Sequence, residues 1–159
     1  MPISKDVKIG KNSKIYHPDL VNLYGCEIGE DCIIGAFVEI RKGVKIGNKV
    51  KIQASVFIPE GVVIEDEVFI GPHVVFTNDL YPRATNSDGN LKNSNDWKAG
   101  STLVRKRASI GANVTVLCGV TIGEGALIGA GSTVVSNIPA WVVAVGNPSK
   151  VLHKVKKEV

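Results

Sequence analysis

Apolar residues recur at every sixth position through the middle of the chain, in a column that runs without a gap from Ile28 to Phe76. A second apolar column stands two positions earlier, from Cys26 to Val74, and glycine often follows the first column. A six-residue period fits neither the 3.6-residue turn of an α-helix nor the two-residue alternation of an amphipathic strand. It predicts a parallel β-helix of hexapeptide repeats, an all-β triangular prism with three hexads in each coil. An Ile- and Val-rich β-sandwich would not keep one register over this length.

The hexad pattern is interrupted over residues 77–101 and resumes over residues 104–134. The interruption is rich in Ser, Asn, Asp, Gly and Pro, which favour turns. Loops this long inside a compact domain are commonly functional. Tyr81 and Trp97 favour an ordered arm that docks on another surface, because disordered spacers seldom carry large aromatic residues. The first coil is also expected to be irregular, with a bulge near residues 16–22.

Residues 148–158 are predicted to form a short C-terminal helix. Asn147 suits the N-cap of this helix, and Pro148 suits its first position. The apolar residues that would share one face of the helix are Val151, Leu152 and Val155. The lysines between them would face solvent or an anion.

Length and composition favour one domain spanning residues 1–159. The net charge of +4 is mild and concentrated near the C-terminus, which does not suggest a nucleic-acid partner. The chain has no run of 18 apolar residues and no apolar signal segment at its start, so we expect a cytoplasmic protein without a membrane partner. Cys26, Cys32 and Cys118 occupy interior or corner positions and are expected to be reduced core residues.

Four segments indicate which family of hexapeptide-repeat proteins the chain resembles. They are residues 69–84, Trp97 with residues 102–104, residues 109–113, and the turn at residues 146–150. With these segments, nearly the whole chain resembles the left-handed β-helix acyltransferases. It is most similar to the nucleotide-linked 3-amino-sugar N-acetyltransferases of bacterial surface-glycan and lipopolysaccharide biosynthesis. Members of this group acetylate the 3-amino group of UDP-2-acetamido-3-amino-2,3-dideoxyglucuronate. The left-handedness is implied by this resemblance.

The resemblance implies a homotrimer with active sites between adjacent prisms and acetyl-CoA as co-substrate, without a metal. The pantetheine of acetyl-CoA would lie beside the later coils, where small residues leave the backbone accessible, and its adenine and phosphates near the C-terminal turn. The implied cofactor-binding residues are Ala112, Ala130, Arg105, Asn147, Pro148 and Lys150. For Arg105, which belongs to a basic run, a solvated surface is the alternative.

Two residues are candidate catalytic groups. Asn78 lies at the mouth of the arm and would either close an Asx-turn or, as the resemblance implies, accept a hydrogen bond from the sugar amine and orient it. His73 lies near a corner and would be either a general base or a surface or interface histidine. The departing thiolate of coenzyme A could itself collect the proton of the amine, so the need for a general base stays open.

The acceptor is expected to be a UDP- or dTDP-linked amino sugar. Arginines can clamp a diphosphate or a sugar carboxylate, or they can simply be solvated. A tyrosine can stack on a base or anchor the arm. A side chain that replaces the corner glycine projects outward. The candidate substrate-binding residues are Arg41, Gln53, Asp79, Tyr81 and Arg83.

Three other functions share the prism. A γ-type carbonic anhydrase would need three histidines around one zinc ion, and His17, His73 and His153 fall too far apart along the coils to share it. A non-catalytic hexapeptide scaffold is disfavoured by the arm and the basic tail. An O-acetyltransferase acting on a sugar hydroxyl stays open as an alternative acceptor class.

Overall fold

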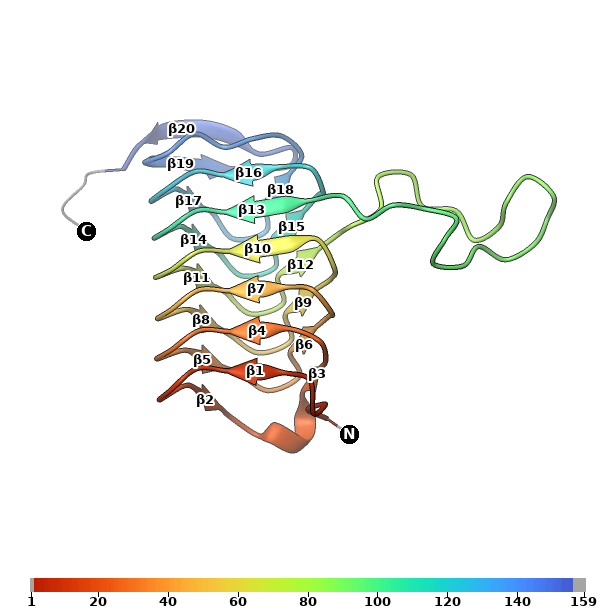
Figure 1. The fold of residues 1–159 in the computed structure, drawn as a ribbon. Helices are drawn as coiled ribbons and strands as arrows, with labels where there is room; N and C mark the ends of the chain where they lie inside the picture. Colours follow the sequence, from red (N-terminus) through yellow and green to blue (C-terminus); the bar gives the residue numbers. More distant parts are fainter. Residues whose placement is uncertain (1, 156–159) are drawn as a thin grey trace.

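The computed structural model describes residues 2–155 and shows a three-sided stack of short strands from which one long loop projects (Figure 1). Each side of the prism is a sheet whose neighbouring strands come from successive coils and run parallel, except for the last strand of one sheet, which is antiparallel. The predicted all-β prism is therefore confirmed, and it is consistent with the left-handed β-helix that the resemblance implies. No helix among the described residues is long and apolar enough to span a membrane.

The chain visits the three sheets in turn, and each sheet collects every third strand. Sheet I contains β1 (Lys8–Ile9), β4 (Glu27–Ile28), β7 (Lys45–Ile46), β10 (Val62–Ile64), β13 (Thr102–Val104) and β16 (Thr121–Ile122). Sheet II contains β2 (Lys14–Ile15), β5 (Ile33–Ile34), β8 (Lys51–Ile52), β11 (Phe69–Ile70), β14 (Ser109–Ile110), β17 (Leu127–Ile128), β19 (Val142–Val145) and β20 (Lys150–Lys154). Sheet III contains β3 (Asn22–Leu23), β6 (Glu39–Ile40), β9 (Phe57–Ile58), β12 (Val75–Phe76), β15 (Thr115–Val116) and β18 (Thr133–Val134).

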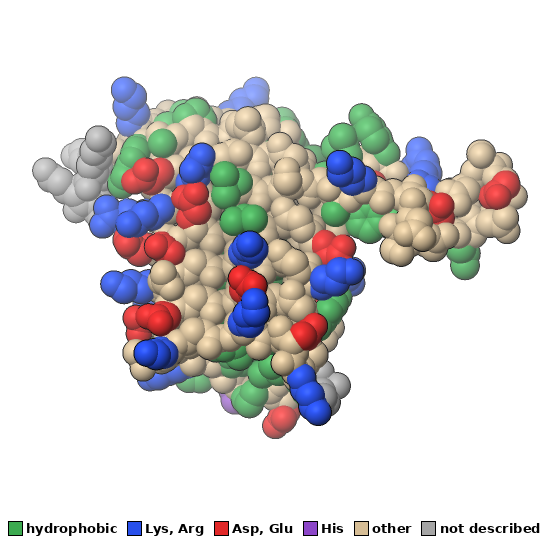
Figure 2. Space-filling view, in the orientation of Figure 1, with side chains coloured by type: hydrophobic (Ala, Val, Ile, Leu, Met, Phe, Trp, Pro, Cys, Tyr) green, Lys and Arg blue, Asp and Glu red, His purple; other side chains and the backbone are tan. Residues whose placement is uncertain are grey.

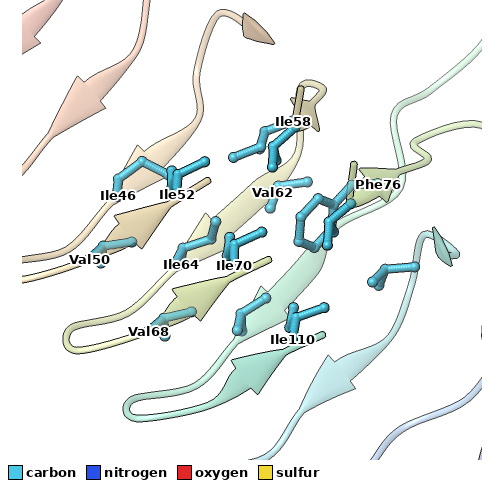
Figure 3. Packing of buried hydrophobic residues seen from close by; sticks show 14 of the residues in the cluster. Ile46, Val50, Ile52, Ile58, Val62, Ile64, Val68, Ile70, Phe76 and Ile110 are labelled. Atoms are coloured by element: carbon cyan, nitrogen blue, oxygen red, sulfur yellow. The ribbon is translucent and has the colours of Figure 1, made fainter. Parts of the chain in front are cut away.

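The two apolar columns of the sequence fill the interior of the prism (Figure 3). Ile52, Ile70 and Ile110 stack on one another in sheet II and are fully buried. Burial of one such side chain contributes about 1.5–3 kcal/mol. A register slip of one residue would turn this whole set outward, so the interior fixes which residues of each strand face solvent.

Three edges, here called corners, join the sheets. Corner I–II follows each strand of sheet I, corner II–III follows each strand of sheet II, and corner III–I follows each strand of sheet III. Many corners place one residue in the left-handed region, including His73 at φ 59° and Arg107 at φ 62°. Since a shift of six residues moves a side chain to the next corner, neighbours in the sequence can face different sides of the molecule.

The first coil is irregular, as expected. A short 3-10 helix, η1 (Pro18–Leu20), lies between β2 and β3 and absorbs the extra chain length. The following interior position is taken by Leu23, which is 1% exposed.

The predicted C-terminal helix is wrong. Residues 150–154 form β20, which pairs antiparallel with β19, while the end of the predicted helix lies outside the described residues. Asn147 is therefore not a helix N-cap; it precedes Pro148 through a cis peptide bond in the turn between the two strands. The free edge of β19 needs partners for its backbone groups, and this need overrides the local helical preference.

Residues 77–101 leave the prism at corner III–I and return to the same corner (Figure 1). The base of this arm is closed by a hydrogen bond from the Gly100 amide to the Asn78 carbonyl, 2.8 Å long. Farther out, Thr85 and Leu91 form an antiparallel bridge, which gives the arm a small hairpin.

The three cysteines are buried and form no disulfide. Burial raises the pKa of the Cys26 thiol to about 11, and it also raises the pKa of Cys32. Little thiolate is present near neutral pH, so these side chains are core residues rather than nucleophiles.

Candidate active site

Corner II–III brings together most of the expected cofactor-binding residues. Ala112 and Ala130 occupy successive coils, joined by a hydrogen bond from the Gly131 amide to the Ala112 carbonyl, 2.8 Å long. In the next layer the Gly146 carbonyl accepts from the Thr133 amide at 3.0 Å, which places the Asn147–Pro148 turn above them. The small side chains leave a continuous backbone edge along three layers, available for hydrogen bonds to amide groups of a ligand.

A shallow apolar groove on sheet II borders this corner. It has a volume of about 240 Å³, and its lining includes Phe69, Ser109, Leu127 and Ala130. A second groove of about 270 Å³ shares Ser109 and Leu127 and continues toward corner I–II, where Trp141 forms part of its lining. Together these grooves form a path across the outer face of the later coils.

Sequence reasoning missed Phe69, Ser109 and Leu127. The signal was present, because each stands immediately before an interior isoleucine, where two of the three early strands of sheet II carry lysine, Lys14 and Lys51. Replacement of a charged outward residue by an apolar or small one marks a strand whose outer face is not simply solvated.

His73 and Gln53 also lie at corner II–III, one and two coils before Ala112. The His73 amide donates to the Ala54 carbonyl at 3.0 Å, and the Asn113 amide donates to the Pro72 carbonyl at 2.9 Å. The His73 side chain is exposed. A cofactor at Ala112 and an imidazole at His73 therefore lie on the same edge of the prism.

Asn78 lies at a different corner, at the root of the arm. It is half-buried, and the segment before it is anchored because the Cys118 amide donates to Thr77 Oγ1 at 3.1 Å. The Asx-turn expected as one alternative for Asn78 is made by its neighbour instead, since Asp79 Oδ1 accepts from the Tyr81 amide at 2.9 Å. The Asn78 side chain is not needed to close this turn.

The arm residues beyond this turn point away from the prism. Tyr81 is 78% exposed, and Arg83 is exposed, with its Nη1 donating to the Pro82 carbonyl at 3.3 Å. Leu80 and Leu91 are exposed as well. An isolated prism thus leaves Leu80, Tyr81 and Leu91 of the arm uncovered, whereas Trp97 is half-buried.

Arg41 is held on the outer side of sheet III. Its Nε donates to Glu39 Oε1 at 2.8 Å, and its guanidinium carbon lies 5.0 Å from the centre of the Phe57 ring. The hydrogen bond to Glu39 raises the Arg41 pKa. Arg41 lies two coils before the arm root at corner III–I, on the side of Asn78 rather than of His73.

Arg105 lies apart from the other expected cofactor-binding residues. It belongs to corner I–II, where its Nη1 forms an ion pair with Glu65 Oε1 at 3.1 Å. Ala112 and Ala130 lie at corner II–III, across the width of sheet II. Lys150, by contrast, begins β20 next to Val145 and is exposed at the end of corner II–III.

His73 and Asn78 stand at the two ends of β12. Five residues of nearly extended chain separate them, which corresponds to roughly 16 Å. The two side chains therefore face different corners of one prism. Neither joins a metal cluster, because the described residues contain no group of three His, Cys, Asp or Glu side chains that could hold a metal ion.

Comparison with known proteins agrees with this architecture. Residues 43–78 and 101–136 match the model of bacterial transferase hexapeptide repeats, and residues 26–59 match the hexapeptide repeat of succinyl-transferases. The chain belongs to the hexapeptide-repeat acyltransferase family.

Among solved structures, the chain is similar to a mutant form of AntD, an N-acyltransferase from Bacillus cereus, in complex with dTDP and coenzyme A. The identity is 25% with a TM-score of 0.73, over 95% of this chain and 85% of that one. It is also similar to a galactoside acetyltransferase bound to coenzyme A, at 27% identity and a TM-score of 0.69, over 81% of this chain and 64% of that one.

Among curated proteins, 52 residues are 50% identical to the dTDP-3-amino-3,6-dideoxy-α-D-galactopyranose 3-N-acetyltransferase of Aneurinibacillus thermoaerophilus. This match covers 33% of the chain and 27% of that enzyme. The chain also matches a putative acetyltransferase of Staphylococcus aureus, over 34% of the length of that protein. The chain therefore aligns with about a third of the length of this relative.

Proposed function

We propose that the protein is an N-acetyltransferase that transfers the acetyl group of acetyl-CoA to the amino group, in the first place the 3-amino group, of a nucleotide-linked sugar. The similarity to AntD over 95% of the chain, in a complex with dTDP and coenzyme A, carries this proposal. The match to a 3-amino-sugar N-acetyltransferase supports the same acceptor class.

Coenzyme A fits corner II–III in this proposal. Its pantetheine amides would bond to the backbone edge at Ala112 and Ala130, and its apolar atoms would lie in the groove beside Leu127. The turn at Asn147 and Pro148, with Lys150 beyond it, would meet the phosphates. Arg105 is left out of this proposal, since its guanidinium pairs with Glu65 at another corner.

The acceptor half of the site belongs to the arm root in this proposal. Asn78 would accept a hydrogen bond from the sugar amine and so orient the lone pair of the amine nitrogen toward the thioester carbonyl. A correctly placed neutral amine needs little further activation. The C–N bond forms as the C–S bond breaks, and the departing thiolate takes the proton of the amine. Tyr81, Arg83 and Asp79 would contact the nucleotide or its diphosphate.

The separation of His73 from Asn78 supports a site shared between chains. One prism cannot bring both ends of β12 to the same reacting atoms, so a site that uses both would combine corner II–III of one copy with the arm root of another. The exposed Leu80, Tyr81 and Leu91 side chains provide apolar surface for such a contact. The expected assembly is a homotrimer.

Thiol release from acetyl-CoA tests the activity, measured against 3-amino and 4-amino sugars linked to UDP or dTDP. Turnover with a 3-amino nucleotide sugar is the expected result. A galactoside included as a hydroxyl acceptor tests the O-acetyltransferase alternative, which the similarity to galactoside acetyltransferase favours. Turnover only with the galactoside would replace the N-acetyl proposal.

Light scattering tests the assembly. We expect a trimer, and a fully active monomer of 16.9 kDa would exclude a site shared between copies.

A further inference from the structure

The arm breaks the continuity of the stack. Within the early coils, strand partners are 18 residues apart, as for Lys51 and Phe69. Across the arm they are 40 residues apart, as for Phe69 and Ser109. The coils before the arm and the coils after it therefore meet without the short covalent path that sets the register elsewhere.

Hexapeptide repeats leave this junction ambiguous. If the second half slid by one hexad, every interior residue would still meet an interior position, with Ile110 in place of Val104 above Ile64. In the main interior column the exchanged side chains of the second half are Val and Ile, which differ by one methylene group, while the second column exchanges Thr102, Ala108 and Val114. The arm can absorb six residues in either direction because loop-closure entropy changes slowly with length. The apolar pattern thus distinguishes these registers weakly.

Two oppositely charged corners meet at this junction, on the left edge of the molecule in Figure 2. The last corner I–II before the arm is called the acidic corner, and the first one after it the basic corner. The acidic corner contains Glu65, Asp66 and Glu67, and the basic corner contains Arg105, Lys106 and Arg107.

The contacts between the two corners are specific. Glu65 binds the Arg105 guanidinium at 3.1 Å and the Lys106 amide at 2.9 Å. Glu67 pairs with Arg107 at 2.9 Å and with the Lys106 ammonium at 3.2 Å. These are three of the six ion pairs among the described residues, and all three cross the one junction that the arm interrupts.

We propose that the acidic and basic corners select the hexad register in which the second half of the prism stacks on the first. In the two neighbouring registers the basic corner would face residues 71–73 or residues 59–61. The first of these segments contains no carboxylate and the second contains one, at Glu60. All three ion pairs would be lost. The charges therefore disfavour registers that the apolar pattern permits.

The selected register also determines which residue of the early coils lies beside the proposed cofactor-binding residues. It places Ala112 one coil above His73, so that the early and late coils share one edge. This consequence rests on the proposed function, whereas the register itself can be measured without activity.

Cross-linking after refolding reports the register directly. Val63 and Leu103 are partners on the outer face of sheet I, so Val63→Cys with Leu103→Cys reports the observed register. Val63→Cys with Ser109→Cys, and Phe69→Cys with Leu103→Cys, report the two slipped registers. Neighbouring strands lie within the Cα separation that a disulfide requires. Each double variant is unfolded in urea, refolded at low ionic strength and oxidised with oxidised glutathione.

With native corners we expect the Val63–Leu103 cross-link and little of the slipped ones. Glu65→Lys with Glu67→Lys should raise the ratio of slipped to native cross-link by at least ~5-fold, because attraction becomes repulsion at each pair. Adding Arg105→Glu and Arg107→Glu should restore the native ratio. If the one-sided variant does not refold, rescue by the reciprocal change supports the proposal equally, and failure of that rescue overturns it.

Glu27→Lys is the matched control. Its ion pair with Lys8, at 2.7 Å, joins two coils that the chain connects without an arm. Reversal there should leave the cross-link ratio unchanged. A one-sided reversal of the acidic corner that refolds with the native ratio would overturn the proposal, whatever the enzyme assay shows.

Discussion

Corners I–II and II–III are built by the same hexapeptide repeat but present opposite surfaces. At the junction below the late coils, corner I–II carries long charged side chains that pair with one another, as Glu67 does with Arg107. At the same height, corner II–III carries Ala112 and Ala130, whose small side chains leave the backbone open. The charged side chains of corner I–II pair with one another, whereas the backbone of corner II–III remains exposed to a ligand. The predictions that follow test this contrast and its extension to the third corner.

The largest effect is expected from the arm at corner III–I. Replacing residues 79–101 by a short Gly-Ser linker should abolish binding of the amino-sugar nucleotide and leave acetyl-CoA binding intact, because the residues proposed to bind coenzyme A belong to corner II–III and none belongs to the arm. Calorimetry with each ligand measures this, and light scattering checks that the variant still assembles. Retained affinity for the sugar nucleotide would remove Tyr81 and Arg83 from the acceptor site.

Asn78→Ala should lower turnover by about 100-fold, the size of effect expected when a reacting group loses its orientation. Acetyl-CoA affinity should change little, since the amide is assigned to the amine. Asn95→Ala, on the exposed part of the arm, is the matched control and should keep wild-type turnover. Equal loss in both variants would point to the arm as a whole rather than to the Asn78 amide.

A long charged side chain can be introduced at corner II–III and a small one at corner I–II, which tests the difference between the two corners directly. Ala112→Lys should weaken acetyl-CoA binding by at least ~10-fold, because a long side chain covers the backbone edge. Lys106→Ala, at the same position of the charged corner, should leave acetyl-CoA binding unchanged and cost no more than ~1 kcal/mol of stability. If both changes weaken binding alike, the cofactor extends to corner I–II.

His73→Asn should reduce turnover by no more than ~10-fold, because a well-placed neutral amine does not require a strong base. The pH profile of kcat in both proteins is the measurement. A loss beyond ~1,000-fold, with disappearance of an ionisation near neutral pH, would make His73 the catalytic base.

The smallest effect concerns the pH dependence of the charged corner. The hydrogen bond from Arg107, and then that from Lys106, lowers the pKa of Glu67 below its ordinary value of 4.5. Its contribution to stability is therefore present above pH 4.5 and is lost as the pH falls through the lowered pKa. Urea unfolding should separate wild type from Glu67→Gln at neutral pH but not in strong acid.

The interior of the prism could be predicted from the sequence because a strict period of six leaves one way to bury the isoleucine column. The irregular first coil was also visible as a break in that period. The tail was predicted wrongly, because Val151 and Leu152 fit a helix locally while β19 required a partner that only the assembled prism reveals.

The residues expected to bind the cofactor lie at two different corners of the prism. Ala112, Ala130 and Asn147 were assigned from the resemblance, and the structure brings them to one edge. Arg105 was assigned to the same group of cofactor-binding residues, from the basic run that contains it. In a hexapeptide prism, however, a separation of about six residues turns the chain to the next corner. Proximity in the sequence is therefore a poor guide, and counting positions modulo 18 would have separated Arg105 from Ala112.

The antiparallel strand β20 also determines where this protein can change in length. A parallel stack ordinarily ends in a row of open amide and carbonyl groups that would accept another coil, but β20 runs the other way along β19 and occupies that row. In sheet II, a coil appended after β20 would meet an antiparallel strand, whereas sheets I and III end in parallel strands, β16 and β18. An 18-residue duplication could be accommodated among the early coils, where each layer repeats the one below it. A coil inserted there would leave the spacing between the arm root and corner II–III of the late coils unchanged, because both lie after the insertion.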